Sequence, residues 1–261
     1  MAIGRNKLNI VVLLMYAIIM ILFLYPLAQI IVVSFGADYS KIPPEIIPPE
    51  IKYTGYIEFF INPKFARWIL NSVVFTVSVT FGSIALAVLA GYALSRLDFP
   101  GRAILFWYVI FGTMIPPIIT YIPLFMILLK WKMINTYQGL IIPLLPSAYN
   151  VFLFKQAFDS VPKDYEEAAY IDGAGPLTIA FRVLLPIIRP IIVTNILFNF
   201  VWNWNNFVWP WFVAPKEDFW TLPLAVYLTT WSYTVYFWKY ASSAVIQFIV
   251  PLALYIAATS Y

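Results

Sequence analysis

The sequence predicts an all-helical membrane protein, a single domain over residues 1–261 that is built from six membrane-spanning helices. Only 11% of its residues are charged and its mean hydropathy is +0.84, whereas a soluble domain carries charge on about a quarter of its residues. Helices satisfy every backbone N–H and C=O inside lipid, and the uncharged runs are too long to be strands of a barrel. The spans are therefore expected to form a helical bundle.

Seven uncharged runs approach or exceed the ~20 residues that cross a bilayer. They cover residues 8–37, 68–95, 103–129, 133–154, 190–215, 219–238 and 240–261. The first run follows Arg5 and Lys7 as a secretory signal would, but it is too long for one, so we interpret it as a retained span. The sixth run holds Pro223 among Thr and Tyr residues, which is typical of an interfacial or re-entrant loop. Six spans follow, with seven as the alternative.

Proline is expected to shape the segments between and within these spans. Residues 42–65 combine proline with aromatic residues, which predicts an extended loop with a short interfacial piece. Five prolines are expected to kink the third and fourth spans: Pro116, Pro117, Pro123, Pro143 and Pro146. In the second span, Thr76, Thr80 and Ser83 form a small polar face beside Gly82 and Gly91, which favours close helix packing.

The charges do not orient the bundle. With six spans and the amino terminus inside, the 16 lysine and arginine residues divide equally between the two sides. The positive-inside rule therefore gives no orientation.

An acidic, alanine-rich turn interrupts the hydrophobic sequence at DYEEAAYIDGAG, residues 164–175. Asp159 or Ser160 can cap a short helix over about residues 162–171, and carboxylates in its first turn are stabilised by the helix dipole. A piece this short and this charged is expected to lie outside the lipid. A plain connecting loop and a docking element are both open at this point.

The end of this short helix is marked by glycine and proline. Gly173 and Gly175 can adopt a positive φ, and Pro176 cannot continue the helix but can begin a new one. The chain is therefore expected to turn sharply here.

Several classes of chemistry are excluded by composition. The chain has no His and no Cys, so imidazole bases, thiolate nucleophiles and most zinc sites are absent, and we expect no bound metal. It also lacks a Gly-Lys dipeptide, so no P-loop can hold ATP. Its Lys and Arg residues are scattered rather than clustered, which argues against nucleic acid as a partner.

The acidic turn matches the E-A-A-x3-G-x9-I-x-L-P pattern of ABC-importer permeases from Glu167 to Pro186, with Val183 in place of Ile. Five further stretches resemble the carbohydrate-uptake permeases, in particular the maltose-type second membrane subunit. They are FARWILNSV (65–73), GYALSRLDFPGR (91–102), NTYQGLIIP (135–143), WNNFVWP (204–210) and TLPLAVY (221–227). The chain departs from that family at Asn206, where an acidic residue is common, and at its last residues, which lack a basic tail.

The resemblance implies a type I importer permease in the cell membrane, non-catalytic, with both termini in the cytoplasm and a coupling helix at about residues 160–175. The implied partners are a second, different permease subunit, two ATPase subunits that carry ATP and Mg, an extracellular solute-binding protein, a sugar or oligosaccharide, and lipid. The residues expected to couple to the ATPase are Glu166, Glu167, Ala168, Ala169, Asp172, Gly173 and Ala174. A permease for another solute, such as a polyamine or a phosphonate, is the alternative.

Four asparagines in the fifth run are expected to form one polar stripe: Asn195, Asn199, Asn203 and Asn206. Their spacing keeps them within about 80° of one another over about 16 Å of helix. Lipid would reject this stripe, so it must face another helix or a watery path. Interhelical hydrogen bonding and a translocation wall are both open, and Trp202 could stack on a sugar or belong to an interfacial belt.

Two other functional classes lack support in the sequence. An intramembrane enzyme would need acid–base or nucleophilic groups inside the spans, and no carboxylate pair lies there. An ATP-independent carrier often displays inverted repeats and ionisable residues at the membrane midplane, and neither is evident.

Overall fold

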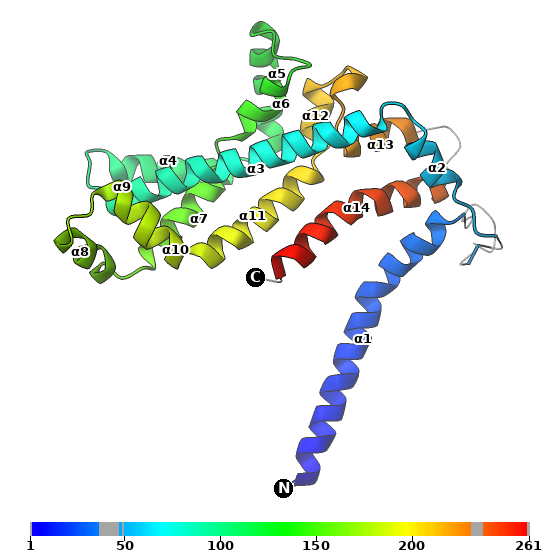
Figure 1. The fold of residues 1–261 in the computed structure, drawn as a ribbon, viewed down its shortest axis with the longest axis horizontal. Coiled ribbons are helices and arrows are strands. Elements are labelled where there is room, and N and C mark those ends of the chain that lie inside the picture. The colour runs from blue at the N-terminus through cyan, green and yellow to red at the C-terminus, as the bar shows by residue number, and fades with distance from the viewer. Residues whose placement is uncertain (1, 37–46, 49, 231–236, 260–261) are drawn as a thin grey trace. The chain divides into compact units, whose positions relative to one another are not determined.

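The computed structural model describes residues 2–36, 47–48, 50–230 and 237–259, and every regular element in this part of the chain is a helix. Two compact units are present. The first contains residues 1–65 and 226–250, and the second contains residues 66–225 and 251–261. The elements are labelled in Figure 1.

Three helices are long and apolar enough to cross a membrane by themselves: α1 (Ala2–Ser34), α3 (Phe65–Arg96) and α14 (Phe237–Thr259). Three bent pairs pass the same test. They are α4 (Arg102–Met114) with α5 (Pro117–Lys130), bent by 102°; α6 (Tyr137–Ile141) and η1 (Ile142–Leu144) with α7 (Ala148–Asp159), bent by 44°; and Pro176–Ile187 with α11 (Arg189–Trp204), bent by 78°. The described residues thus hold six spans if each bent pair counts as one.

Most of the predicted prolines lie at these bends. Pro116 lies between α4 and α5, and Pro117 is the first residue of α5. Pro143 lies in η1, and Pro146 lies between η1 and α7. The kinks predicted in the third and fourth spans are therefore confirmed. Pro123 lies inside α5, which continues past it to Lys130.

The fifth run is interrupted, which the sequence analysis did not predict. Instead of one helix over 190–215, α11 ends at Trp204 and a separate short helix, α12 (Val208–Val213), follows. Asparagine side chains bond the backbone at this point: Asn205 Nδ2 donates to the Val201 carbonyl (2.9 Å), which also accepts from the Asn205 amide (3.1 Å), and Asn206 Oδ1 accepts from the Trp209 amide (3.2 Å). Such local side-chain bonds compete with the helix.

η3 (Glu217–Phe219) ends at the first residue of the sixth run, and the run contains α13 (Leu222–Thr230). The described part of α13 has nine residues, fewer than the ~20 that cross a bilayer. The remainder of the loop expected at 219–238 includes residues 231–236, which lie outside the described part of the chain.

The first unit contains α1, α2 (Thr54–Phe60) and most of α14. α2 is the short piece expected within 42–65, whose residues 42–46 and 49 lie outside the described part. Glu58 forms an ion pair with Lys239 (3.0 Å), and Ser34 Oγ lies 2.6 Å from the Tyr56 hydroxyl. Along α1, residues 12–31 are mostly exposed and apolar, as a lipid-facing or partner-facing helix is.

The second unit is built around α3, which lies beside α7 and α11 (Figure 1). Its main core joins Ile84, Val88 and Tyr92 of α3 to Phe154 and Phe158 of α7. Gly91 lets α3 approach the α7 backbone, since a Cβ there would lie 2.8 Å from the Lys155 nitrogen. Thr76, Thr80 and Ser83 are all buried, so the packing role expected for this face is confirmed.

Candidate functional site

The acidic turn folds as a short helix, α8 (Asp164–Ile171). The cap predicted from Asp159 or Ser160 is wrong, because both side chains are used at the end of α7. Ser160 Oγ donates to the Ala157 carbonyl (2.7 Å), and Asp159 Oδ1 accepts from Ser95 Oγ (2.6 Å). α8 begins after Lys163 without a side-chain cap.

The carboxyl end of α8 is closed by Gly173, as predicted. Gly173 has a φ of +83°, its amide donates to the Tyr170 carbonyl, and the Ala174 amide donates to the Ala169 carbonyl, both at 3.0 Å. These two bonds form the Schellman arrangement, which satisfies the last carbonyls of a helix. Gly175 keeps a negative φ of −77°, and α9 (Pro176–Thr178) begins directly after it.

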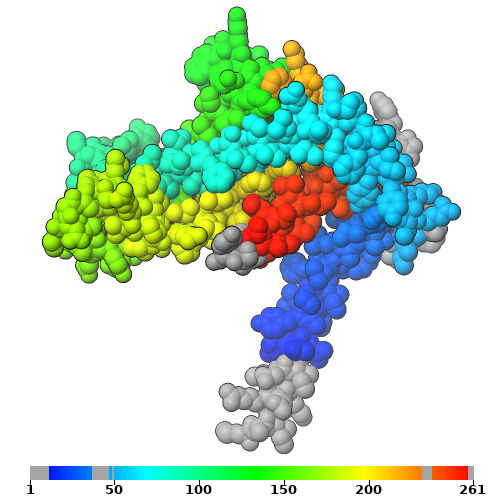
Figure 2. Space-filling view, viewed as in Figure 1, coloured from blue at the N-terminus to red at the C-terminus, as the bar shows by residue number. Residues whose placement is uncertain are grey.

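α8 has an inner face and an outer face. Ala169 and Ala174 are half-buried and pack against the main core of the unit. The outer face exposes Glu167 and Ala168, and beyond it Asp172 and Gly173. Ile171 is 87% exposed. Figure 2 shows the segment around α8 and α9, in yellow-green, uncovered at the left edge of the view.

Glu166, one of the residues expected to couple to an ATPase, is buried. Its Oε1 lies 2.8 Å from Nε of Arg96 at the end of α3, and the two side chains are only 11% and 6% exposed. Of the two glutamates expected to couple to an ATPase, only Glu167 is exposed.

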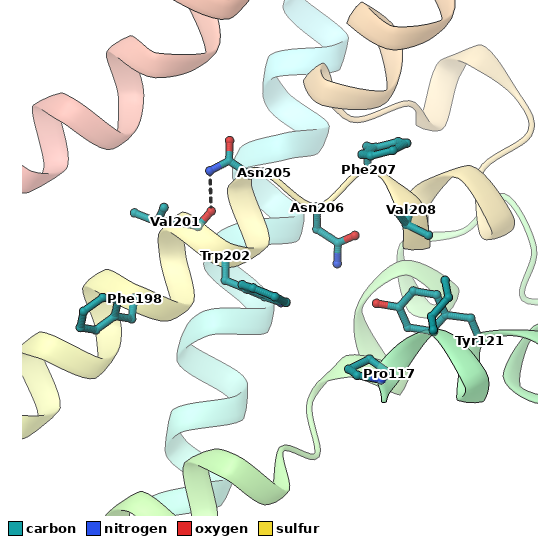
Figure 3. A pocket seen from close by; sticks show the side chains of 10 residues that line it. Pro117, Tyr121, Phe198, Val201, Trp202, Asn205, Asn206, Phe207 and Val208 are labelled. Atoms are coloured by element: carbon teal, nitrogen blue, oxygen red, sulfur yellow. Dashed lines mark hydrogen bonds between the residues drawn. The ribbon is translucent and has the colours of Figure 1, made fainter. Parts of the chain in front are cut away.

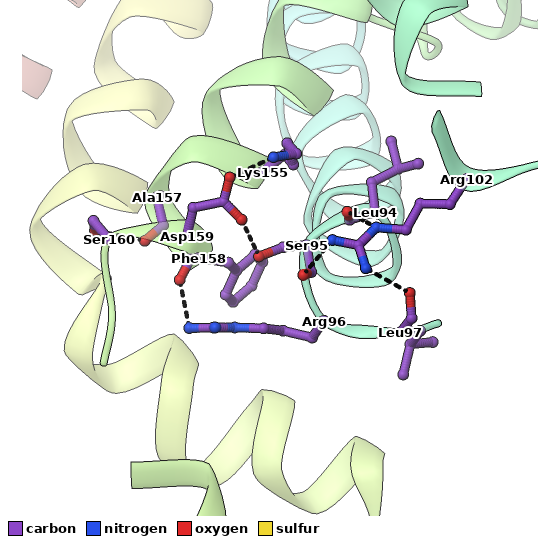
Figure 4. A network of polar contacts seen from close by, with 10 residues as sticks. All are labelled: Leu94, Ser95, Arg96, Leu97, Arg102, Lys155, Ala157, Phe158, Asp159 and Ser160. Atoms are coloured by element: carbon purple, nitrogen blue, oxygen red, sulfur yellow. Dashed lines mark hydrogen bonds and ion pairs between the residues drawn. The ribbon is translucent and has the colours of Figure 1, made fainter. Parts of the chain in front are cut away.

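The end of α3 contacts residues before, within and after α8, and Figure 4 shows its contacts with the end of α7. Arg96 Nη2 donates to the carbonyls of Phe158 and Val161, each at 2.6 Å. Ser95 bonds Asp159, which also forms an ion pair with Lys155. The Tyr92 hydroxyl donates to the Pro176 carbonyl (3.0 Å). The sequence analysis did not predict these contacts of Tyr92, Ser95 and Arg96. The position of Arg96 at the end of an uncharged span was a signal for its role.

Asparagines join three helices in the middle of the second unit. Asn150 of α7 is fully buried; its Nδ2 donates to Ser83 Oγ (2.9 Å) and its Oδ1 accepts from Asn199 Nδ2 (3.2 Å). Asn199 Nδ2 also lies 2.7 Å from Asn195 Oδ1, and Asn203 Nδ2 donates to Thr80 Oγ1 (3.3 Å). Asn195, Asn199 and Asn203 therefore form hydrogen bonds to neighbouring helices, which is the interhelical bonding expected as one of two alternatives. Asn150 was missed, although it is a polar residue inside an apolar run.

A cavity of about 390 Å³ lies beside this network. The four residues expected on a translocation path all line it: Asn199, Trp202, Asn203 and Asn206. Ser83, Thr113, Thr120 and Ser147 add hydroxyl groups. None of the residues that line this cavity, all of them described, carries a charge.

Asn206 lies beyond the end of α11 and not on the helical stripe expected for it. It reaches the cavity because the chain turns at residues 205–207. A neighbouring hollow of about 540 Å³ shares Pro117, Tyr121, Trp202 and Asn206 with the first, and it is also lined by uncharged side chains. Figure 3 shows Trp202 and Asn206 across from Pro117 and Tyr121.

The tryptophans of this region have two different roles. Trp202 is 74% exposed and lies against both hollows, whereas Trp204 and Trp209 are buried. Trp209 Nε1 donates to the Leu140 carbonyl at 3.0 Å, so it is a packing residue. Among the described residues, no cluster of His, Cys, Asp or Glu has the size needed to hold a metal ion.

Comparison with known proteins places these features in a family. Residues 83–260 match the model of the binding-protein-dependent transport system inner membrane component. The chain is 31% identical to the arabinooligosaccharides transport system permease protein AraQ of Halalkalibacterium halodurans, over 81% of this chain and 77% of that protein. It is 28% identical to the diacetylchitobiose uptake system permease protein NgcG of Streptomyces coelicolor, over 90% of this chain and 80% of that protein.

A third relative carries a different solute in its name. The sn-glycerol-3-phosphate transport system permease protein UgpE of Brucella abortus is 29% identical, over 77% of this chain and 71% of that protein. A crystal structure of a bacterial ABC transporter involved in the import of the acidic polysaccharide alginate includes a chain with the same fold. It covers 99% of this chain and 97% of its own length, with a TM-score of 0.83 and 21% identity.

Proposed function

The chain belongs to the family of binding-protein-dependent transport system inner membrane components, and on this premise we propose that it forms half of an import pathway for an uncharged sugar or oligosaccharide. In this proposal it is a non-catalytic subunit, and α8 couples the pathway to a cytoplasmic ATPase. ATP and Mg are bound by two ATPase subunits. A second, different permease completes the pathway, and an extracellular solute-binding protein delivers the sugar.

The uncharged lining of the 390 Å³ cavity is the observation that favours an uncharged substrate. Asparagine amides and Ser or Thr hydroxyls both donate and accept hydrogen bonds, which suits sugar hydroxyls. Trp202 adds an aromatic face. An ionic solute would leave its charge unpaired against this half of the pathway, and burying an unpaired charge is costly. A neutral carbohydrate, as in the names of two relatives, therefore fits better than sn-glycerol 3-phosphate, a phosphonate or a polyamine.

The outer face of α8 supports its role as the coupling helix. Glu167 can pair with a cation of the ATPase, and the small Ala168 allows close seating. Tyr165 and Ile171 are 52% and 87% exposed on a segment expected outside the lipid, and apolar exposure of this kind marks a protein interface. Ala169, Asp172, Gly173 and Ala174 set the exit of the chain from this face. With α8 in the cytoplasm, six spans put both termini there.

Uptake by the whole complex tests this proposal. The complex that co-purifies with a tagged chain would be reconstituted into vesicles with its solute-binding protein, and labelled arabino-oligosaccharides, diacetylchitobiose and sn-glycerol 3-phosphate would be offered separately. We expect ATP-dependent uptake of at least one neutral oligosaccharide and none of the phosphate ester. Uptake of sn-glycerol 3-phosphate alone would overturn the assignment of an uncharged substrate.

A further inference from the structure

Three side chains on one face at the end of α3 contact the segment around α8. Tyr92, Ser95 and Arg96 are spaced i, i+3 and i+4, so their side chains leave the helix on the same side. They contact Pro176 after α8, Asp159 before it, and Glu166 within it. We call Tyr92, Ser95 and Arg96 the α3 clamp. The segment is thus held on both sides of α8 by a single turn of another helix.

The other end of α3 holds a second connecting segment in the same unit. Asn71 Nδ2 donates to the carbonyls of Asp218 and Trp220, each at 2.9 Å, and the Leu222 amide donates to Ser72 Oγ (2.6 Å). From Asn71 to Arg96 the helix rises by about 38 Å, at 1.5 Å per residue. α3 therefore links α8 to residues 218–222 across the length of a membrane span.

α3 is also the span best suited to transmit movement without bending. It runs unbroken from Phe65 to Arg96 and contains no proline. The spans that flank α8 in the chain are both bent, by 44° before it and by 78° after it. Proline lies inside α1 and α14 as well. Sharp bends are places where the helical hydrogen-bond ladder is interrupted.

From these contacts we propose that Arg96 is a positioning residue that fixes α8 to α3, so that the two helices move as one body and α3 carries the movement of α8 to residues 218–222. This inference rests on the proposed coupling role of α8. Coupling then passes through α3, which is not adjacent to α8 in the sequence, and not only through the two bent spans that flank it.

The chemistry of the α3 clamp favours such a role over simple stability. Burying the Arg96–Glu166 pair removes two charges from water, a cost that a well-packed apolar pair would avoid, so a buried pair is weak evidence for stability alone. The planar guanidinium reaches Glu166 and the Phe158 and Val161 carbonyls at once. A lysine at this position would supply one point charge and could not reproduce that geometry.

Two spin labels on the assembled complex test whether α8 and α3 move together. The chain has no Cys, so Tyr170→Cys on α8 and Leu89→Cys on α3, which are 51% and 48% exposed, can be labelled selectively. The distance between the labels would be measured in the nucleotide-free and ATP–vanadate-trapped complex, in the Arg96, Arg96→Lys and Arg96→Gln backgrounds. Arg189→Gln, which removes an exposed arginine outside the coupling segment, is the matched control.

With Arg96 we expect one narrow distribution that is the same in both states. Arg96→Gln should broaden it and lower the stimulation of ATP hydrolysis by the solute-binding protein about tenfold, a coupling loss of ordinary size. Arg96→Lys should give a width and a stimulation between those of the parent and Arg96→Gln, and Arg189→Gln should match the parent. If the complex with Arg96→Gln does not assemble, Glu166→Gln takes its place. The comparison of the two states with Arg96 present still tests whether α8 and α3 move together.

A distance that changes between the two states with Arg96 present would overturn the inference, as would an Arg96→Gln complex indistinguishable from the parent. Failure of the proposed function would give a different result in the hydrolysis assay. In that case the solute-binding protein would not stimulate hydrolysis by the parent complex, while the label distance would still report whether the α3 clamp holds.

Discussion

Trp202 is the residue whose side chain best separates substrate contact from packing. It lies against both hollows and is 74% exposed in this chain. Trp202→Ala should raise the KM for sugar uptake about fivefold, as expected for loss of ~1 kcal/mol of stacking. Trp211→Ala is the matched control, because Trp211 is half-exposed on α12 and lines neither hollow. An unchanged KM in Trp202→Ala would remove Trp202 from the sugar pathway.

Gly173 and Gly175 form a second matched pair at the residue scale. A Cβ would meet no atom within 4 Å at either position, but Gly173 has a φ of +83° whereas Gly175 does not have a positive φ. Gly173→Val should therefore strain the exit of α8 by about 2 kcal/mol and uncouple ATP hydrolysis from uptake, while the protein still reaches the membrane. Gly175→Val should transport normally. Uptake assays with surface-expression blots decide, and normal transport by Gly173→Val would count against the coupling role.

At the scale of elements, the approach of α3 to α7 depends on Gly91. A Cβ there would lie 2.8 Å and 3.0 Å from backbone atoms of Lys155 and Phe154, whereas a Cβ at Gly82 would meet only the end of the Leu145 side chain, at 2.6 Å. Gly91→Ala should force the two helices apart and cost about 1–3 kcal/mol. Gly82→Ala should be close to neutral, since Leu145 can change rotamer and alanine favours a helix. Thermal unfolding in detergent measures both, and equal melting temperatures would contradict this packing.

The approximate positions of the candidate spans could be predicted because apolar length alone marks them. The bends at Pro116 and Pro117 could also be predicted, since proline removes a helical hydrogen bond. The end of α11 could not be predicted, because it involves local bonds from the Asn205 and Asn206 side chains to the backbone. The absence of charge along the run does not show where the helix ends.

In the candidate site, too, some features could be predicted from the sequence and others could not. Gly173 could be predicted as the end of α8 because a helix often closes on a glycine with positive φ. The inward turn of Glu166 could not, because it depends on Arg96, which is 70 positions away in the sequence. Asn206 was expected on the polar stripe and reaches the cavity by another route, from the turn after α11. Contacts between distant elements therefore limit what the sequence reveals.

At the scale of the whole molecule, the account depends on α8 lying in the cytoplasm against an ATPase. Because the chain has no Cys, single cysteines report sidedness directly. Ala168→Cys marks the outer face of α8, and Lys216→Cys marks the exposed segment before η3, which is expected on the opposite side of the membrane.

Labelling of Ala168→Cys with a membrane-impermeant maleimide is the most direct measurement. We predict that it reacts in inverted vesicles stripped of the ATPase, is protected when the ATPase is bound, and does not react in right-side-out vesicles, where Lys216→Cys does. Reaction of Ala168→Cys from the outside, or labelling unaffected by the ATPase, would contradict the account.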